Sequence, residues 1–330
     1  MNFERIIVNA LEAGLGLETV VFALAAIGLN VHFGYTGLLN FGQSAFMAMA
    51  AYGLAVTVAT YDLPMWLGII VGLGLSVLLA LLLGIPTLRL RADYLAIVTI
   101  AAAEIVRLTA RSVTFEETLG GSDGRQAFSS DFYALNPYSE GEYGFGSFGF
   151  NERALWVLTV GWILVGLSCL VVFLLMRSPW GRVLKAIRED EDAVRSLGKN
   201  VYSYKMQSLV IGGVLGCLGG FILALGRSSI QPDIFGTETT FFAYTILILG
   251  GAARVASPVI GAMIFWVLLS LTDNILNEAI NEGLISSSVI NNTQVGQFRF
   301  MLVGLLLMVL MIFRPQGIFG DRREIALDAR

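Results

Sequence analysis

The sequence has very few residues that bind metals or form disulfides. Its 330 residues include one histidine and two cysteines, and only 14% are charged. Because Cys169 and Cys217 both lie inside apolar runs, we expect neither a zinc site nor a disulfide framework. We interpret both cysteines as small buried hydrophobic residues. The net charge of −4 gives no sign of nucleic-acid binding, so no nucleic-acid partner is expected.

Motifs for nucleotide hydrolysis are also missing. The sequence has no G-x-x-x-x-G-K-[ST] phosphate loop, so the chain does not bind ATP in that way. Membrane enzymes usually need several ionisable groups at one depth, and here only Glu104 fits that description. We therefore expect no catalytic residues, no metal and no cofactor. The N-terminal residues, with one arginine and acidic residues in an apolar stretch, do not resemble a cleavable signal peptide.

Long apolar runs dominate what is present. Hydrophobic residues make up 56% of the chain, and the mean hydropathy is +0.74. A helix needs roughly 20 apolar residues to cross a membrane. Runs of about this length lie at 65–87, 93–111, 154–176, 206–226, 255–272 and 298–313, with weaker candidates at 14–32, 41–60 and the short 239–252. The sequence predicts an all-α polytopic membrane protein with about 8–9 transmembrane helices, in one domain over residues 1–320.

The charges of the polar loops predict the orientation. Basic residues gather in 88–92, 177–205, 253–255 and the end of the chain, which places these segments in the cytoplasm. The loops 112–153 and 273–297 are mainly acidic, which places them on the extracytoplasmic side. The C-terminal tail, 321–330, is then cytoplasmic. Upstream of residue 62 the charges do not show on which side of the membrane each loop lies.

The segment 177–205 is unusually charged for so apolar a chain. Ser178-Pro179 supplies a helix cap and first turn, and Gly198 a C-terminal stop. Apolar residues recur at helical spacing, so one helix face could dock into a cytoplasmic partner. These residues are Leu184, Ile187, Val194 and Leu197.

The segment 28–46 is too polar and too rich in glycine for an ordinary membrane span. Non-helical backbone at membrane depth requires burial in protein or a wet cavity. Two interpretations stay open: a broken helix beside a translocation path, or a glycine-rich packing seam with hydrogen bonds across it. On the first interpretation Tyr35, Asn40 and Gln43 are candidate path residues.

Glu104 and Arg107 lie three residues apart in 93–111 and so share a helix face. An ionisable residue near the membrane midplane is a candidate functional group, and Glu104 is our fourth candidate for the path. The alternative, which we favour, is a structural ion pair with Arg107 and Arg111 reaching toward the outer interface. His32 is interpreted as a packing residue rather than as a proton relay.

Six motifs occur in a fixed order along the chain: GLNVHFGYTGLLNFGQSAFMAMAAY, LRADYLAIVTIAAAEIVRL, LGGSDG, GRVLKAIREDEDAVRSLG, ILGGAARVASPVIGA and RPQGIFG. Together they closely resemble the branched-chain amino-acid ABC importer permease family, on the side of its M-type subunit. The resemblance covers about residues 20 to 320. Within it, the family's frequent GHAAF reads Gly42-Gln43-Ser44-Ala45-Phe46 here, a departure that bears on the solute carried.

The resemblance implies partners and a mechanism. Such permeases pair with an H-type sister permease in the bacterial plasma (inner) membrane, and two cytoplasmic ATPase subunits drive alternating access. An extracytoplasmic binding protein delivers the substrate. Residues 182–198 match the family's cytoplasmic coupling segment. The resemblance and the helix pattern give these ATPase-coupling candidates: Leu184, Ile187, Arg188, Glu191, Ala193, Val194, Leu197 and Gly198. Val194 and Arg195 depart from the small residues often found there.

Other functions remain as rivals. Related permeases carry urea, short amides or other neutral amino acids, so a urea or amide permease is the first alternative. An ion-coupled secondary transporter is a second, and it would depend on Glu104. A membrane enzyme would need a reactive cluster that the sequence does not offer, and a receptor or scaffold role is not excluded. For branched-chain or other neutral amino acids, we expect a mainly apolar path.

Overall fold

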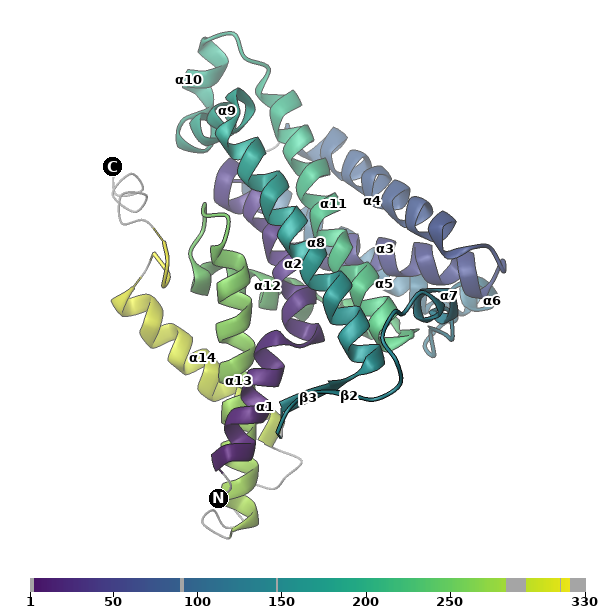
Figure 1. Ribbon diagram of the computed structural model, residues 1–330. Helices are drawn as coiled ribbons and strands as arrows, with labels where there is room; N and C mark the ends of the chain where they lie inside the picture. Colours follow the sequence, from purple (N-terminus) through teal and green to yellow (C-terminus); the bar gives the residue numbers. More distant parts are fainter. Residues whose placement is uncertain (1–2, 90–91, 147, 283–294, 315, 321–330) are drawn as a thin grey trace.

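The computed structural model describes residues 3–89, 92–146, 148–282, 295–314 and 316–320. This part of the chain is mostly helical and carries two small two-stranded sheets (Figure 1), so the all-α expectation is confirmed. The α-helices are α1 (Phe3–Leu15), α2 (Leu17–Leu29), α3 (Gln43–Ala59), α4 (Met65–Thr87), α5 (Ala92–Arg111), α6 (Glu116–Leu119), α7 (Ser130–Ala134), α8 (Glu152–Arg177), α9 (Pro179–Glu189), α10 (Glu191–Ser196), α11 (Val201–Arg227), α12 (Thr237–Gly250), α13 (Ser257–Asn281) and α14 (Val295–Phe313). The strands are β1 (Arg125–Gln126), β2 (Glu142–Phe145), β3 (Phe148–Asn151) and β4 (Ser229–Ile230).

Five helical segments of the described chain are long and apolar enough to cross a membrane. They are Phe3–Tyr35, Met65–Thr87, Glu152–Arg177, Val201–Arg227 and Ser257–Asn281. The first is bent, because α1 ends at Leu15 and α2 begins at Leu17. The chain is therefore a multi-pass membrane protein, and the 65–87 run predicted from sequence has the same bounds as α4. α12 has only 14 residues and corresponds to the short apolar run 239–252.

Helix α11 is the centre of the bundle and packs on α2, α3 and α4. The side chains of α11 are small where neighbouring helices come closest. A Cβ atom on Gly220 would lie 2.1 Å from the carbonyl oxygen of Met47 in α3, and one on Gly212 would lie 2.6 Å from the carbonyl oxygen of Gly28 in α2. These approaches leave no room for a larger residue, so glycine sets the spacing of the three helices.

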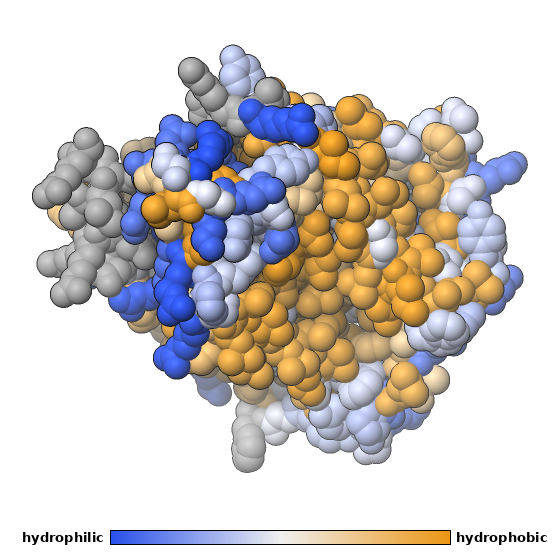
Figure 2. Space-filling view, turned by 90° about the horizontal axis from the view of Figure 1, so that it is seen from above, coloured by the Kyte–Doolittle hydropathy of each residue, from blue (hydrophilic) through white to orange (hydrophobic). Residues whose placement is uncertain are grey.

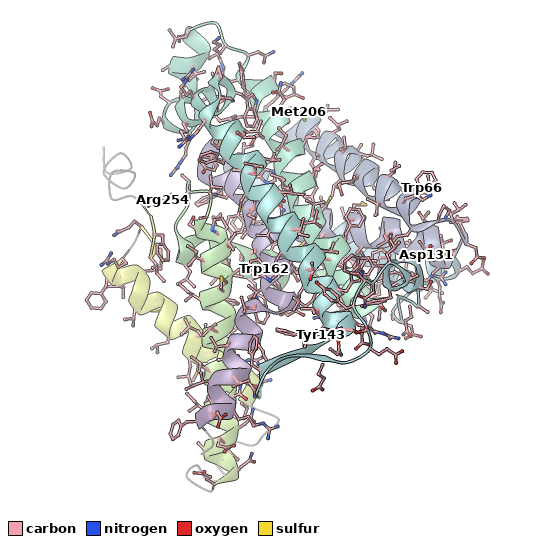
Figure 3. The ribbon with its side chains drawn as sticks, viewed as in Figure 1. Trp66, Asp131, Tyr143, Trp162, Met206 and Arg254 are labelled. Atoms are coloured by element: carbon pink, nitrogen blue, oxygen red, sulfur yellow. The ribbon has the colours of Figure 1, made fainter. Side chains whose placement is uncertain are left out.

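The apolar surface of the bundle faces outward along the long helices. Large hydrophobic side chains on α4 and α8, such as Leu82 and Leu174, are more than half exposed. Trp66 also points away from the bundle near one end of α4 (Figure 3). Seen from the α9–α10 end, hydrophilic side chains gather in one region and most of the remaining surface is hydrophobic (Figure 2). An outward apolar surface of this kind suits contact with lipid.

The described residues of 112–153 extend along the end of the bundle remote from α9 and α10, from α6 and α7 to strands β2 and β3 beside α1 (Figure 1). Strands β2 and β3 form a hairpin, and β1 pairs with β4 from the end of α11. Burial raises the pKa of the Tyr133 phenol, so the phenol stays protonated and donates a hydrogen bond of 3.1 Å to the Leu225 carbonyl. This bond and the β1–β4 pair hold the segment on α11.

The glycine turn 120–124 lies against this strand pair. Gly120, Gly121 and Gly124 all have positive φ, which glycine adopts without strain. A Cβ atom on Gly124 would lie 1.8 Å from the Ile230 carbonyl oxygen. The letters GGSDG also fit the G-x-S-x-G pattern of hydrolases, but the turn follows the short helix α6 rather than a strand, so it is not a nucleophile elbow.

One loop boundary expected from sequence is wrong. A polar loop was expected from residue 273, but α13 continues to Asn281. The polar residues of this last stretch have partners in the structure: Asp273 lies 3.2 Å from Arg299 of α14, and Asn9 of α1 donates to Asn274 at 2.9 Å. Because Asp273 and Asn274 have partners on neighbouring helices, these polar residues do not interrupt α13. The expected cytoplasmic tail, 321–330, lies outside the described residues.

Candidate functional site

The helix break predicted in 28–46 is present. α2 continues into a π-helical turn, Asn30–Tyr35, and regular helix resumes only at Gln43. Gly37, between them, has a φ of +73°. Side chains from other helices satisfy the non-helical backbone: the Phe41 N–H donates to Thr99 of α5 at 3.0 Å, and Tyr244 of α12 donates to the Asn40 carbonyl at 3.0 Å. The break is thus stable because other helices bury it and supply its hydrogen-bond partners.

Asn30 connects the break to the turn between α12 and α13. Its side chain donates to the Arg254 carbonyl at 2.8 Å and accepts from the Ala253 N–H at 2.9 Å. Arg254 itself is labelled beside this turn in Figure 3. One amide side chain therefore links two segments that are more than 220 positions apart in sequence.

His32 occupies the middle of the break and is fully buried. Its Nε2 lies 3.1 Å from the Leu209 carbonyl of α11, and its Nδ1 lies 3.1 Å from the side-chain amide nitrogen of Asn40. A neutral ring with its proton on Nε2 satisfies both contacts, since it donates to the carbonyl and accepts from the amide. This geometry fits the packing role expected for His32.

The charged segment 177–205 contacts this break directly. Its predicted caps are present: Ser178 accepts from the Gly181 N–H, and Gly198 has a φ of +77°. Arg188 of α9 donates to the Gly34 carbonyl. The Arg188 side chain also packs at Gly37, where an added Cβ atom would lie 3.3 Å from the Cγ of Arg188. α9 is thus joined to the broken helix through Arg188.

A second contact lies one turn earlier on α9. The Lys185 ammonium nitrogen is 5.7 Å from the centre of the Tyr35 ring, within reach of a cation–π contact. Both contacts end on the same short stretch, 34–37. α9 is therefore attached to the break at two points.

Between α8 and α11 the segment 177–205 forms two separate short helices, α9 and α10, rather than one. Asp190 has extended backbone and caps α10 by accepting the Ala193 N–H at 2.9 Å, which ends α9 and begins α10. Glu191 forms ion pairs with Arg195 at 2.8 Å and with Lys205. Lys205 already belongs to α11, so its ion pair with Glu191 holds α10 on the start of that helix.

The apolar face of this segment points inward, contrary to the docking role expected for it. Leu184, Ile187 and Val194 are 0%, 3% and 5% exposed, because they pack against this chain's own helices. Leu197, at 80% exposed, is the one member of the four that a partner can reach. Helical spacing identified the apolar face correctly but did not show what covers it. Ala193 and Gly198 are exposed beside Leu197.

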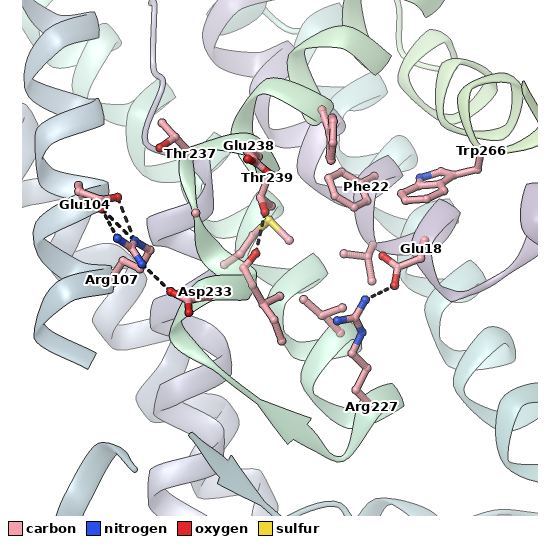
Figure 4. A pocket seen from close by; sticks show the side chains of 16 residues that line it. Glu18, Phe22, Glu104, Arg107, Arg227, Asp233, Thr237, Glu238, Thr239 and Trp266 are labelled. Carbon is pink, nitrogen blue, oxygen red and sulfur yellow. Dashed lines mark hydrogen bonds and ion pairs between the residues drawn. The ribbon is translucent and has the colours of Figure 1, made fainter. Parts of the chain in front are cut away.

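A cavity of about 580 Å³ lies at the other end of the bundle (Figure 4). It is lined by α2, α3, α5, α11, α13 and the segment from Asp233 into α12. Small-molecule sites typically have volumes of about 300–1,000 Å³. The apolar lining residues are Val21, Phe22, Met47, Leu223, Ile234, Phe242 and Trp266.

Two groups of ion pairs face the cavity from opposite walls (Figure 4). On one wall Arg107 pairs with Glu104 and, at 2.6 Å, with Asp233. On the other wall Arg227 of α11 pairs with Glu18 of α2. The sequence did not reveal the pairing of Arg107 with Asp233 or that of Arg227 with Glu18, because these partners are 126 and 209 positions apart. The sequence shows only that Glu18 begins one apolar run and that Arg227 ends another, which does not reveal that the two residues meet.

The four candidate path residues do not form one site. Glu104 lines the cavity, and its pairing with Arg107 agrees with the structural ion pair that we favoured. Tyr35, Asn40 and Gln43 are 2%, 0% and 0% exposed and belong to the packed junction around the break instead. Within the described residues, no group of three or more His, Cys, Asp or Glu side chains is placed to hold a metal.

Comparison with known families identifies the chain. The family model described as "Branched-chain amino acid transport system / permease component" matches residues 13–313. The chain belongs to this permease family. It is therefore a permease component of the ABC transport type and not an enzyme. The five long apolar helices are what a membrane permease requires.

Individual relatives agree with the M-type resemblance. The permease is 30% identical to the high-affinity branched-chain amino acid transport system permease protein LivM of Salmonella typhimurium, over 92% of this chain and 69% of that protein. It is 24% identical to LivH of the same organism, over 91% of each chain. Among solved structures, PsaBC from Streptococcus pneumoniae in complex with Fab matches with a TM-score of 0.41 and 12% identity, over 92% of this chain and 91% of that one.

Proposed function

We propose that this permease is the M-type subunit of an ATP-driven importer and forms half of a path for branched-chain or other neutral amino acids. Its proposed partners are an H-type sister permease, two cytoplasmic ATPase subunits and an extracytoplasmic binding protein. The complex lies in the bacterial plasma membrane and works by alternating access. This chain contributes no catalytic residue, and ATP is hydrolysed on the partner chains.

The contact of Arg188 with the broken helix carries this proposal. A permease driven from another chain needs a rigid connection between the surface that meets the motor and the part that moves. Buried Leu184 and Ile187 hold α9 on the bundle, and Arg188 bonds its last turn to Gly34. Exposed residues of the segment, Leu197 among them, then provide the surface for the ATPase.

The proposed topology extends the five long helices. α3, α5, α12 and α14 are shorter or more polar, and with them the single domain 1–320 reaches about 8–9 spans or half-spans. α9, α10 and the C-terminus are placed in the cytoplasm, and 112–153 outside. The basic residues of 177–205 and the acidic residues of 112–153 support this orientation.

Replacing Glu104 by glutamine tests the rival secondary transporter. The importer account expects uptake to fall at most several-fold and to stay dependent on ATP, because Asp233 remains as a partner for Arg107. A partly exposed ion pair contributes only about 0–1 kcal/mol to stability. Uptake of labelled leucine is measured in proteoliposomes containing the complete complex, with and without internal ATP.

The matched control is Glu117→Gln, an exposed carboxylate in α6 that does not line the cavity. It should transport as the wild type does. Uptake by the wild type without ATP, abolished by the change at Glu104, would instead establish ion coupling and refute the importer account.

A further inference from the structure

One wall of the cavity combines an ion pair with an aromatic cluster. Glu18 and Phe22 are four residues apart on α2 and so lie on the same helix face. Arg227, at the end of α11, pairs with Glu18. The Phe22 ring lies 5.5 Å from that of Trp266 and 6.1 Å from that of Phe242, centre to centre. Figure 4 shows Glu18 and Arg227 on the same side of the cavity as Phe22 and Trp266.

We propose that this wall is a binding station for an apolar amino acid in its zwitterionic form, held with its charged head on Glu18–Arg227 and its side chain on the aromatic cluster. The aromatic cluster here means Phe22, Phe242 and Trp266. The inference rests on the proposed importer function and specifies the solute class and its orientation in the path.

The ion pair matches the head group of an amino acid in charge and in geometry. The ammonium and carboxylate of a zwitterion are adjacent, as are the carboxylate of Glu18 and the guanidinium of Arg227. Arg227 donates to Glu18 through Nη2 and keeps further N–H donors for a substrate carboxylate. Glu18 accepts through Oε1 and keeps a second oxygen for the ammonium. Each charge of the ligand then meets an opposite charge without breaking the pair.

The pair is accessible and far from α9. The side chains of Arg227 and Glu18 are 41% and 30% exposed, so a solute can reach them. α11 rises about 40 Å from Val201 to Arg227 at about 1.5 Å per residue, which places the pair at the opposite end of the bundle from α9 and α10. A solute released by an extracytoplasmic partner would meet this station before it meets the helix break.

The aromatic cluster accounts for the apolar part of the ligand. Aromatic walls bury apolar side chains without needing directional bonds, and they accept aliphatic groups of different shapes. Urea and short amides have no paired charges and little apolar surface, so they use neither half of the station. The station therefore favours neutral apolar amino acids over the urea or amide cargo of related permeases.

The test compares two double variants of the complete complex in proteoliposomes. Glu18→Gln with Arg227→Gln keeps side chains of similar size but removes both charges from the station. Asp273→Asn with Arg299→Gln removes an ion pair of similar exposure, between α13 and α14, that does not line the cavity. Uptake of labelled leucine is measured with saturating liganded binding protein, together with ATP hydrolysis and the melting temperature of each complex.

The station variant should take up leucine about tenfold more slowly or worse, since charge-assisted hydrogen bonds to the substrate are lost. Its melting temperature and its ATP hydrolysis stimulated by the binding protein should stay near those of the wild type. The Asp273–Arg299 variant should transport normally. Leucine uptake at the wild-type rate by the station variant, or a loss matched by the control, would overturn the inference.

A third variant tests the aromatic cluster if the first proves unstable. Trp266→Leu should lower the ratio of leucine to alanine uptake by about tenfold, since a pocket distinguishes substrates by a few methylene groups to about this extent. An unchanged ratio would overturn the placement of the apolar side chain. A wild-type complex that carries urea and not leucine would refute the proposed function itself, whereas normal leucine uptake by the station variant refutes only this inference.

Discussion

Replacing Arg188 by alanine should uncouple transport from ATP hydrolysis. The change removes the charge-assisted hydrogen bond to the Gly34 carbonyl and the side chain that packs at Gly37. Such a bond contributes about 1.5–3 kcal/mol, so leucine uptake should fall about tenfold or more. The ATPase subunits should still co-purify, because the change leaves the exposed surface around Leu197 intact. Uptake and ATP hydrolysis are measured on the same proteoliposomes.

Arg177→Ala is the matched control for Arg188. Arg177 is the last residue of α8, and its guanidinium lies 4.1 Å from the centre of the Phe173 ring rather than at the break. Its removal should leave uptake close to that of the wild type. Normal transport by the Arg188 variant would show that the contact between Arg188 and Gly34 is not needed to couple ATP hydrolysis to transport. Loss of the ATPase subunits from that variant would show that Arg188 acts in docking rather than in transmission.

Replacing Gly220 by alanine should destabilise the whole bundle. A Cβ atom there would lie 2.1 Å from the Met47 carbonyl oxygen, which is backbone and cannot rotate away. α11 must then move off α3, and overpacking of this kind costs about 1–3 kcal/mol or more. We expect a lower melting temperature in detergent and a reduced yield of folded protein.

Gly74→Ala provides the comparison for Gly220. Gly74 is an exposed residue of α4, and a Cβ atom there would meet nothing within 4 Å. Since alanine favours helix by about 1 kcal/mol over glycine, stability should stay the same or rise. Equal melting temperatures for the two variants would contradict the helix spacing assigned to α11.

The predictions from sequence succeeded where the signal is local. Apolar length gave α4 its bounds, the run of glycine and polar residues after α2 gave the helix break, and Ser178 and Gly198 gave the ends of the charged segment. Each of these features depends on residues of one continuous stretch of the sequence. The sequence also carried the family motifs, which the match over 13–313 confirms.

The predictions failed where distant segments decide the outcome. We predicted that the apolar face of α9 docks into a partner, because helical spacing reveals an apolar face but not what packs against it. In the structure the chain's own helices bury this face. The end of α13 was missed because its polar residues are paired with α1 and α14. The cavity was missed because its ion pairs join residues far apart in the sequence, such as Glu18 and Arg227, which are 209 positions apart. Only the packed structure brings such residues together.

The most direct test of the central claim, that this permease is moved from the cytoplasmic side through α9, is the side of the membrane on which Lys185 lies. A single cysteine at position 185, in a chain whose Cys169 and Cys217 are replaced by alanine, is treated with a membrane-impermeant maleimide in intact cells and in inverted vesicles. Glu140→Cys in the same background marks the opposite side. Our account predicts that position 185 reacts only in inverted vesicles and position 140 only in intact cells. Labelling of position 185 in intact cells would contradict it.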